Sequence, residues 1–295
     1  MNPALLGIVS AISWGCLDLV ATVSSRRIGS VLTVVGVSVG GFLMLTAWLL
    51  LSGQGLPALA GQGALPAYGA GIGVVLASLF LFAAFAAGPI AVVSPIASSY
   101  PLTALLLAWA TGDQPTTIAI AAALVVVAGV VVVATSEPTG ETRNASLTRC
   151  ILLAALAHLT WAVTIYAGQY ATQGQTEAVH HAAVSTAWLG RLGGFAVLLP
   201  LLIVARPRAS VGPVWMPVFL LLGLLDVVGI VFVNVAAGSD HPVLATVAAS
   251  CFGVVTILLG WLVLKERIPP LRWLGIAVTF AGVAALVTYG HVDAS

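Results

Sequence analysis

The sequence predicts an all-α integral membrane protein with ten transmembrane helices, arranged as a five-plus-five inverted repeat. Two observations predict the membrane. Hydrophobic residues make up 60% of the 295 residues and charged residues only 6%, whereas soluble domains carry about 25% charged residues. The mean hydropathy is +1.14, so the chain lacks the polar residues needed to cover a water-exposed surface. The third observation, an internal repeat, predicts the arrangement of the helices.

Glycine, proline and charged residues divide the chain into apolar segments near the length of about 20 residues that a spanning helix needs. The predicted spans are 3–23, 31–51, 68–87, 89–110, 117–135, 150–171, 183–205, 216–237, 242–264 and 271–290. The first lacks the basic region and cleavage site of a signal peptide, so we expect it to stay as a span. A polar loop, 136–148, separates a first repeat, 1–135, from a second, 149–295.

The two halves match at an offset near 150 residues. The aligned pairs are Trp14 with Trp161, Gly40-Gly41-Phe42 with Gly193-Gly194-Phe195, Tyr100-Pro101 with Phe252-Gly253, and Trp109 with Trp261. Because each half crosses the membrane five times, the second copy begins on the face where the first ended and has the opposite orientation. Inverted repeats of this kind are typical of secondary transporters and place the substrate site between the halves, near the midplane.

Several short motifs recur in a fixed order along both halves. They include Ser13-Trp14-Gly15 with Asp18, Ser99-Tyr100-Pro101, Gly223-Leu224-Leu225-Asp226-Val227 and Lys265-Glu266-Arg267. On these motifs the chain resembles the EamA-type members of the drug/metabolite transporter (DMT) superfamily over residues 5–135 and 150–288. The resemblance implies a ten-helix secondary transporter in the inner or plasma membrane. One departure is Phe252-Gly253, where the family usually shows Tyr-Pro.

Nine of the ten basic residues lie in, or beside, the loops that follow odd-numbered spans. They are Arg26, Arg27, Arg143, Arg149, Arg206, Arg208, Lys265, Arg267 and Arg272. The positive-inside rule predicts that this face is cytoplasmic, so both termini are expected to be extracytoplasmic. With a net charge of +1 and no basic cluster on a wetted face, the sequence gives no reason to expect a nucleic-acid partner.

Three ionisable residues fall deep inside predicted spans. Arg191 and Asp226 each lie roughly 12–16 Å from the outer edge, and His158 lies roughly 18 Å from it. Charged residues at such depth face a cavity or one another. Two interpretations stay open. In one, Arg191 and Asp226 form a structural pair and His158 is a packing residue; in the other, Asp226 and His158 couple transport to protons beside Arg191.

A further group of residues predicts a cavity lined by aromatic rings. Trp14, Tyr100, Trp161 and Phe252 lie near mid-span in positions related by the repeat, although tryptophan and tyrosine usually lie at the membrane surfaces. Core packing is the alternative interpretation. Asp18 follows Trp14 by four residues and shares its helix face, so it either joins this cavity or pairs with Arg26 or Arg27 near the surface.

The function expected from these residues is secondary transport that exports or exchanges a small metabolite, with protons as the coupling ion. Trp14, Tyr100, Trp161, Phe252 and Arg191 are the predicted substrate-binding residues; Asp18, His158 and Asp226 are predicted to couple protons or form ion pairs. An apolar or aromatic lining with both charges nearby suits an amino acid or similar zwitterion. A lipophilic cation is the alternative, favoured if Arg191 lies elsewhere.

Other functional classes have less support. The chain has no G-x-x-x-x-G-K-[ST] loop for ATP, and no cofactor or metal is expected. A membrane enzyme would need a nucleophile with a base, or a metal cluster, at one membrane face. The spacing of the candidates near the outer face matches no pattern of metal ligands; they are Glu177, His180, His181, Asp240 and His241. A channel would need a filter-like backbone motif. The small-residue spacing Gly190/Gly194 predicts close helix packing within the chain and leaves a homodimer open.

Overall fold

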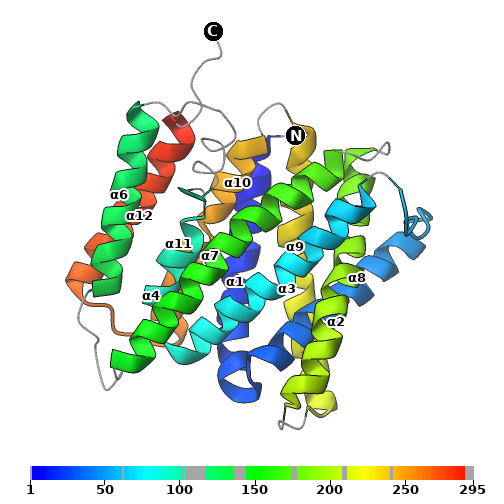
Figure 1. Ribbon diagram of the computed structural model, residues 1–295, viewed down its shortest axis with the longest axis horizontal. Helices are drawn as coiled ribbons and strands as arrows, with labels where there is room; N and C mark the ends of the chain where they lie inside the picture. The colour runs from blue at the N-terminus through cyan, green and yellow to red at the C-terminus, as the bar shows by residue number, and fades with distance from the viewer. Residues whose placement is uncertain are drawn as a thin grey trace.

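The structure is a computed structural model that describes residues 2–61, 63–100, 102–103, 117–135, 144–173, 178–207, 211–239 and 242–289. Throughout these residues the regular structure is helical (Figure 1). Six helices are long and apolar enough to cross a membrane: α1 (Pro3–Ile28), α2 (Ser30–Leu51), α3 (Ala64–Ala87), α7 (Asn144–Gln173), α8 (Val179–Ala205) and α9 (Met216–Val235), the last counted with a short 3₁₀ turn at each end. Shorter helices are α4 (Ile90–Ser98), α6 (Thr117–Thr135), α10 (Pro242–Ser250), α11 (Phe252–Val263) and α12 (Pro270–Tyr289).

The fourth and ninth predicted spans differ from the structure, because neither is one continuous described helix. α4 ends at Ser98, close to Pro101, which has no backbone N–H to continue a helix. Residues 101 and 104–110 of that span, which include Trp109, lie outside the described residues. The ninth span divides at Cys251 into α10 and α11. Gly253 lets α11 approach α4 closely, since an added Cβ would overlap the Ser98 side chain. The two interrupted segments therefore meet inside the bundle.

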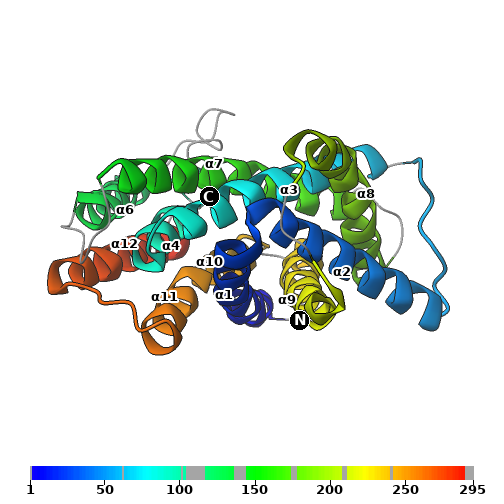
Figure 2. The same cartoon turned by 90° about the horizontal axis from the view of Figure 1, so that it is seen from below.

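The main helix contacts join the two halves of the chain rather than helices within one half. α3 packs on α7 and α8, α9 packs on α1 and α2, and α6 packs on α12. In the repeat, α1, α2 and α3 correspond to α7, α8 and α9. The contact of α1 with α9 therefore has its counterpart in the contact of α7 with α3, and that of α2 with α9 in that of α8 with α3. α1 and α7 also run in opposite directions through the bundle (Figure 1). Figure 2 shows the α6–α12 pair at one side, away from α2.

Glycines allow these contacts between halves to be close. Gly223 of α9 lies against Gly40 of α2, and Gly71 of α3 lies against Gly190 of α8; an added Cβ at Gly223 or Gly71 would overlap the facing backbone. Gly194 packs on Val75 of α3 in the same way. The Gly190/Gly194 spacing therefore serves packing within the chain, as small residues do between membrane helices.

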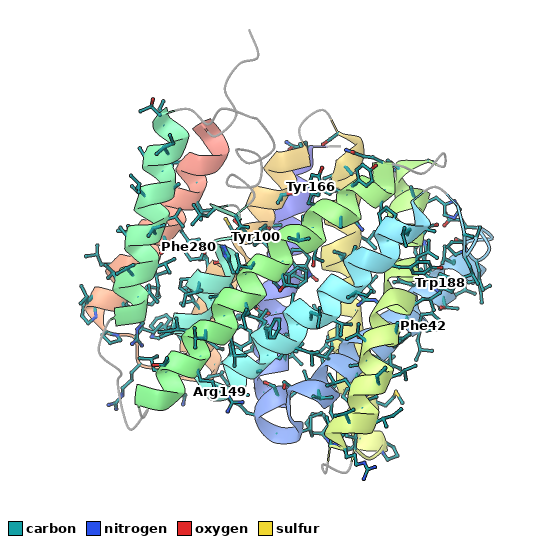
Figure 3. The ribbon with its side chains drawn as sticks, viewed as in Figure 1. Phe42, Tyr100, Arg149, Tyr166, Trp188 and Phe280 are labelled. Atoms are coloured by element: carbon teal, nitrogen blue, oxygen red, sulfur yellow. The ribbon has the colours of Figure 1, made fainter. Side chains whose placement is uncertain are left out.

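The described basic residues at helix ends belong to one end of the bundle. Arg149 lies at the lower end in Figure 3, where α1 and α8 end and α12 begins (Figure 1). At this end Arg26 forms a 3.2 Å salt bridge with Glu266 and donates hydrogen bonds to the carbonyls of Phe85 and Gly88. These contacts tie the end of α1 to α3 and to the segment between α11 and α12.

Candidate functional site

A cavity between the halves brings together the four aromatic residues predicted from the sequence. It contains about 350 Å³ of empty space, including the part open to its mouth. Its lining residues are Trp14, Leu17, Asp18, Ser78, Leu81, Phe82, Tyr100, Trp161, Ile165 and Phe252. We call it the aromatic cavity. Helices α1, α3, α7 and α11 and the end of the α4 segment contribute to it, so residues from both repeats share one wall.

The rings of the aromatic cavity contact one another in tilted and edge-to-face arrangements. The ring centroids of Trp14 and Trp161 are 5.6 Å apart, and Trp14 meets Phe252 edge-on at 6.2 Å. The Tyr100 hydroxyl donates to the Thr246 carbonyl at 2.5 Å, which fixes the phenol. The indole N–H groups of Trp14 and Trp161 are buried and make no hydrogen bond within the described residues. The cavity thus offers aromatic ring surfaces.

Asp18 is the charged residue of the aromatic cavity. Its side chain is buried, with the residue 2% exposed, and its carboxylate accepts a 2.9 Å hydrogen bond from the Thr256 hydroxyl of α11. Arg26 is paired with Glu266 instead. The interpretation of Asp18 as a surface carboxylate paired with Arg26 is therefore wrong, because Asp18 turns inward on the same helix face as Trp14.

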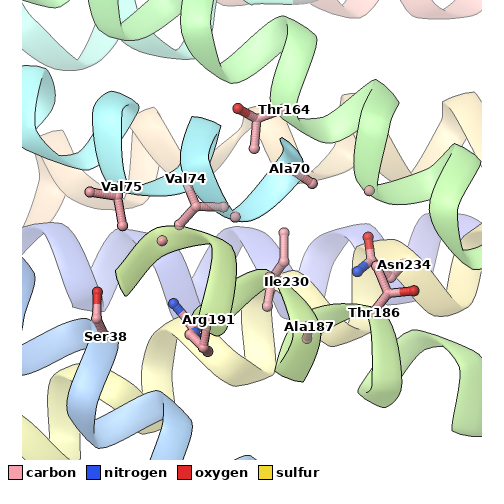
Figure 4. A pocket seen from close by; sticks show the side chains of 14 residues that line it. Ser38, Ala70, Val74, Val75, Thr164, Thr186, Ala187, Arg191, Ile230 and Asn234 are labelled. Carbon is pink, nitrogen blue, oxygen red and sulfur yellow. The ribbon is translucent and has the colours of Figure 1, made fainter. Parts of the chain in front are cut away.

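Arg191 lies in a different cavity, which corrects the expectation of a single site. This second cavity contains about 440 Å³ of empty space, including the part open to its mouth. It is lined by Ser38, Ala70, Gly71, Val74, Val75, Thr164, Gly168, Thr186, Ala187, Gly190, Arg191, Gly194, Ile230 and Asn234 (Figure 4). We call it the polar cavity. Residue depth along a helix fixes height in the membrane but not direction around the bundle, so residues at one height can face separate cavities.

Arg191 and Asp226 form a buried ion pair between α8 and α9. The two residues are 5% and 2% exposed. One terminal nitrogen of the Arg191 guanidinium donates to the Asp226 carboxylate, and the guanidinium lies against Gly41 of α2, where an added Cβ would crowd it. Asp226 lines neither cavity. The pair thus neutralises both charges where the two halves meet.

His158 contacts the α4 segment and lines neither of the two cavities. Its Nδ1 is 3.2 Å from the Ile96 carbonyl, and its Nε2 is 2.5 Å from the Thr103 hydroxyl. A carbonyl only accepts, so the hydrogen-bond network assigns the proton to Nδ1 and makes Nε2 the acceptor of the Thr103 hydroxyl. His158 therefore joins α7 to the interrupted fourth segment and does not meet Asp226, although the two were predicted at similar depth.

Three residues that contribute to these sites were not predicted from the sequence. Thr256 holds Asp18, Asn234 lines the polar cavity, and Gly229 makes room for the Trp14 indole, because an added Cβ there would overlap it. Two signals were present. Thr256 follows Phe252 by one helix turn and shares its face. Asn234 is an amide in a predicted span whose remaining residues are apolar except for Asp226.

The residues considered for a membrane enzyme are only partly described. His180 and His181 lie in the first turn of α8, whereas Glu177, Asp240 and His241 lie outside the described residues. Among the residues that the structure does describe, no group of three histidine, cysteine, aspartate or glutamate side chains is placed to hold a metal ion.

Comparison with known proteins identifies the family. The EamA-like transporter family model matches residues 1–135 and 148–288. One solved crystal structure of a protein with 21% sequence identity aligns over 98% of this chain and 97% of its own, with a TM-score of 0.67, and so has the same fold. None of the curated proteins matches the sequence. The family match covers nearly the whole chain and both of its halves, and the chain therefore belongs to the EamA-like transporter family.

Proposed function

We propose that this transporter is a secondary carrier for a small organic molecule with an apolar or aromatic body and an amino group, with amino acids and similar zwitterions as the substrate class. The observation that carries the proposal is the aromatic cavity with Asp18 in its wall. Aromatic faces attract ammonium groups, and a buried carboxylate needs a positive partner. Export or exchange then proceeds by alternating access around this cavity.

The same carboxylate supports proton coupling. Within the described residues Asp18 has one side-chain donor, the Thr256 hydroxyl, and no cation beside it. In an apolar cavity a lone carboxylate must be compensated, either by a proton or by the ammonium group of the substrate. Alternation between these two partners gives exchange of substrate for protons across the inner or plasma membrane. His158, bonded at both ring nitrogens, is assigned a structural role in this scheme.

A second candidate is export of lipophilic cations. The observation that favours it is that, among the described residues, Asp18 alone brings a charged side chain to the wall of the aromatic cavity, while Arg191 lines the polar cavity. A permanent cation with an apolar body would need no further group. The two candidates differ in one respect: an amino acid requires a site for its carboxylate, and a lipophilic cation does not.

Counterflow in liposomes tests the proposal. Liposomes that contain the purified protein are loaded with an unlabelled amino acid, amine or quaternary ammonium compound, and uptake of the same compound in labelled form is followed. Saturable counterflow of amino acids is expected, together with tolerance of toxic amino-acid analogues in cells that overproduce the protein. Counterflow of quaternary ammonium compounds alone would select the second candidate.

Tryptophan variants localise the site. Trp14→Ala or Trp161→Ala should weaken analogue tolerance strongly, because each removes a ring from the aromatic cavity. The matched control is Trp48→Ala in α2, whose side chain is on the outer surface, with the residue 60% exposed. Equal loss in all three variants would contradict a site at the aromatic cavity.

A further inference from the structure

The polar cavity adjoins the aromatic cavity along two helices. On α3, Val75 lines the polar cavity and Ser78, three residues or about 4.5 Å further along the helix, lines the aromatic cavity. On α7 the linings alternate: Trp161 and Ile165 line the aromatic cavity, and Thr164 and Gly168 line the polar cavity. The two cavities are therefore neighbouring chambers along the same pair of helices, offset by about one turn on α3 and overlapping in height on α7.

The polar cavity contains two buried polar atoms that make no hydrogen bond within the described residues. One is the Arg191 Nε donor, and the other is the Asn234 Oδ1 acceptor. The residues are 5% and 1% exposed, and Figure 4 shows both side chains at the cavity. Buried polar groups in folded proteins nearly always have partners. A donor and an acceptor are thus available here to a molecule that enters the cavity.

The ends of the polar cavity differ. On α9, Gly229 follows Asp226 by one turn and lies against the Trp14 indole, so the Arg191–Asp226 pair is close to the wall of the aromatic cavity. Asn234 is eight residues beyond Asp226, which is about 12 Å further along the helix. The arginine end faces the neighbouring aromatic cavity, and the asparagine end faces away from it.

The chemistry of the arginine end suits a carboxylate. Asp226 occupies one terminal nitrogen of the Arg191 guanidinium, which leaves the Nε–H as a charge-assisted donor. Guanidinium groups match carboxylates in geometry, and a second carboxylate on the other edge of the guanidinium would share it with Asp226. Because Asp226 already neutralises the arginine, such a bound group is held reversibly, as transport requires.

We propose that the Arg191 Nε–H binds the carboxylate of a zwitterionic substrate whose apolar body occupies the aromatic cavity. This inference rests on the proposed function and deepens it, because it assigns the carboxylate site that separates an amino acid from a lipophilic cation. Asn234 then accepts a hydrogen bond from the substrate on its way to or from the far end of the polar cavity.

A ligand series on the wild-type protein tests the inference without any substitution. The probes are phenylalanine, phenylalaninamide and phenethylamine, which share the ring and amino group and differ in the carboxylate. Phenylalanine should bind about tenfold more tightly than either analogue, the value of one hydrogen bond between charged groups. Equal affinities for all three would overturn the carboxylate site and leave amine transport standing. Binding of none of them would overturn both this inference and the proposed substrate class.

A double variant places the effect at Arg191. Arg191→Met with Asp226→Leu replaces the ion pair by apolar side chains of similar size, a change that buried pairs often tolerate. Phenylalanine affinity should fall about tenfold, to that of phenylalaninamide, while phenethylamine binding is unchanged and reports an intact aromatic cavity. The matched control, Arg26→Met with Glu266→Leu, removes the pair at the lower end and should keep the preference. Retention of the preference in the Arg191 variant would overturn the inference; if that variant does not fold, the wild-type series decides.

Discussion

The indole of Trp14 on α1 lies against Gly229 on α9, so closely that a methyl group at position 229 would overlap the Nε1 atom. The contact joins the two repeats, since α1 belongs to the first and α9 to the second. Gly229 also precedes Ile230, which lines the polar cavity, and follows Asp226 of the buried ion pair by three residues. The position of one ring in the aromatic cavity thus depends on the absence of a single side chain.

We predict that Gly229→Ala impairs transport by displacing the Trp14 ring. Overpacking of a filled interior costs about 1–3 kcal/mol, so the thermal midpoint should fall and the KM for substrate should rise. The control is Gly69→Ala in α3, where an added Cβ meets no atom within 4 Å; there the stability should not fall and should rise by up to about 1 kcal/mol, because alanine favours a helix interior over glycine. For each variant, counterflow measures the KM and thermal unfolding in detergent measures the midpoint. Indistinguishable behaviour of the two variants would contradict the contact.

Asp18→Asn should uncouple transport from protons. The amide still accepts the Thr256 hydrogen bond, so the fold is expected to persist, but it cannot exchange a proton for a substrate ammonium group. Uptake against a gradient, driven by an imposed pH difference, should fall to the level of passive equilibration. Affinity for phenethylamine should weaken about tenfold. Glu266→Gln, which neutralises a carboxylate outside the aromatic cavity, is the control, and wild-type accumulation by Asp18→Asn would refute the coupling role.

The sequence predicted the helices well where apolar length alone determines them. It predicted helix ends less well, because charged residues can continue a helix beyond its apolar part. α1 extends to Ile28 rather than residue 23 and includes Arg26 and Arg27, whose side chains reach the interface while their stems stay apolar. α7 likewise begins at Asn144 rather than residue 150.

The candidate site was predictable in part, for a geometric reason. The repeat relates Trp14 to Trp161 and Tyr100 to Phe252, and symmetry-related positions near an axis converge, so their assembly follows from the alignment. Arg191 has no charged counterpart in the first repeat. Its height was predictable from helix rise, but its direction depends on packing between α8, α9 and α2, which no local pattern encodes.

In the ion pair between α8 and α9, each charge should be tolerated in the fold only while the other is present. Asp226→Asn alone leaves Arg191 buried without a counter-charge, which should cost about 3–5 kcal/mol and abolish transport. The double variant Asp226→Asn with Arg191→Gln removes both charges, so thermal stability should recover, whereas pH-driven flux should not. If the double variant transports at the wild-type rate with the wild-type pH dependence, the pair is only structural.

The orientation of the bundle gives the last prediction. The described basic residues at helix ends share the end of the molecule where Arg26 pairs with Glu266, and lysine and arginine in short loops favour the cytoplasm. Both termini should therefore be extracytoplasmic. In a bacterial host, alkaline phosphatase fused to the C-terminus should be active and green fluorescent protein dark. Fusions truncated after Pro207, in the loop that follows α8 at the basic end, should give the reverse pattern and serve as the control. A bright fluorescent fusion with inactive phosphatase at the C-terminus would show that the termini are cytoplasmic and would contradict the prediction. Because transport depends on the cavities between the halves, that result would change only the assigned direction of transport.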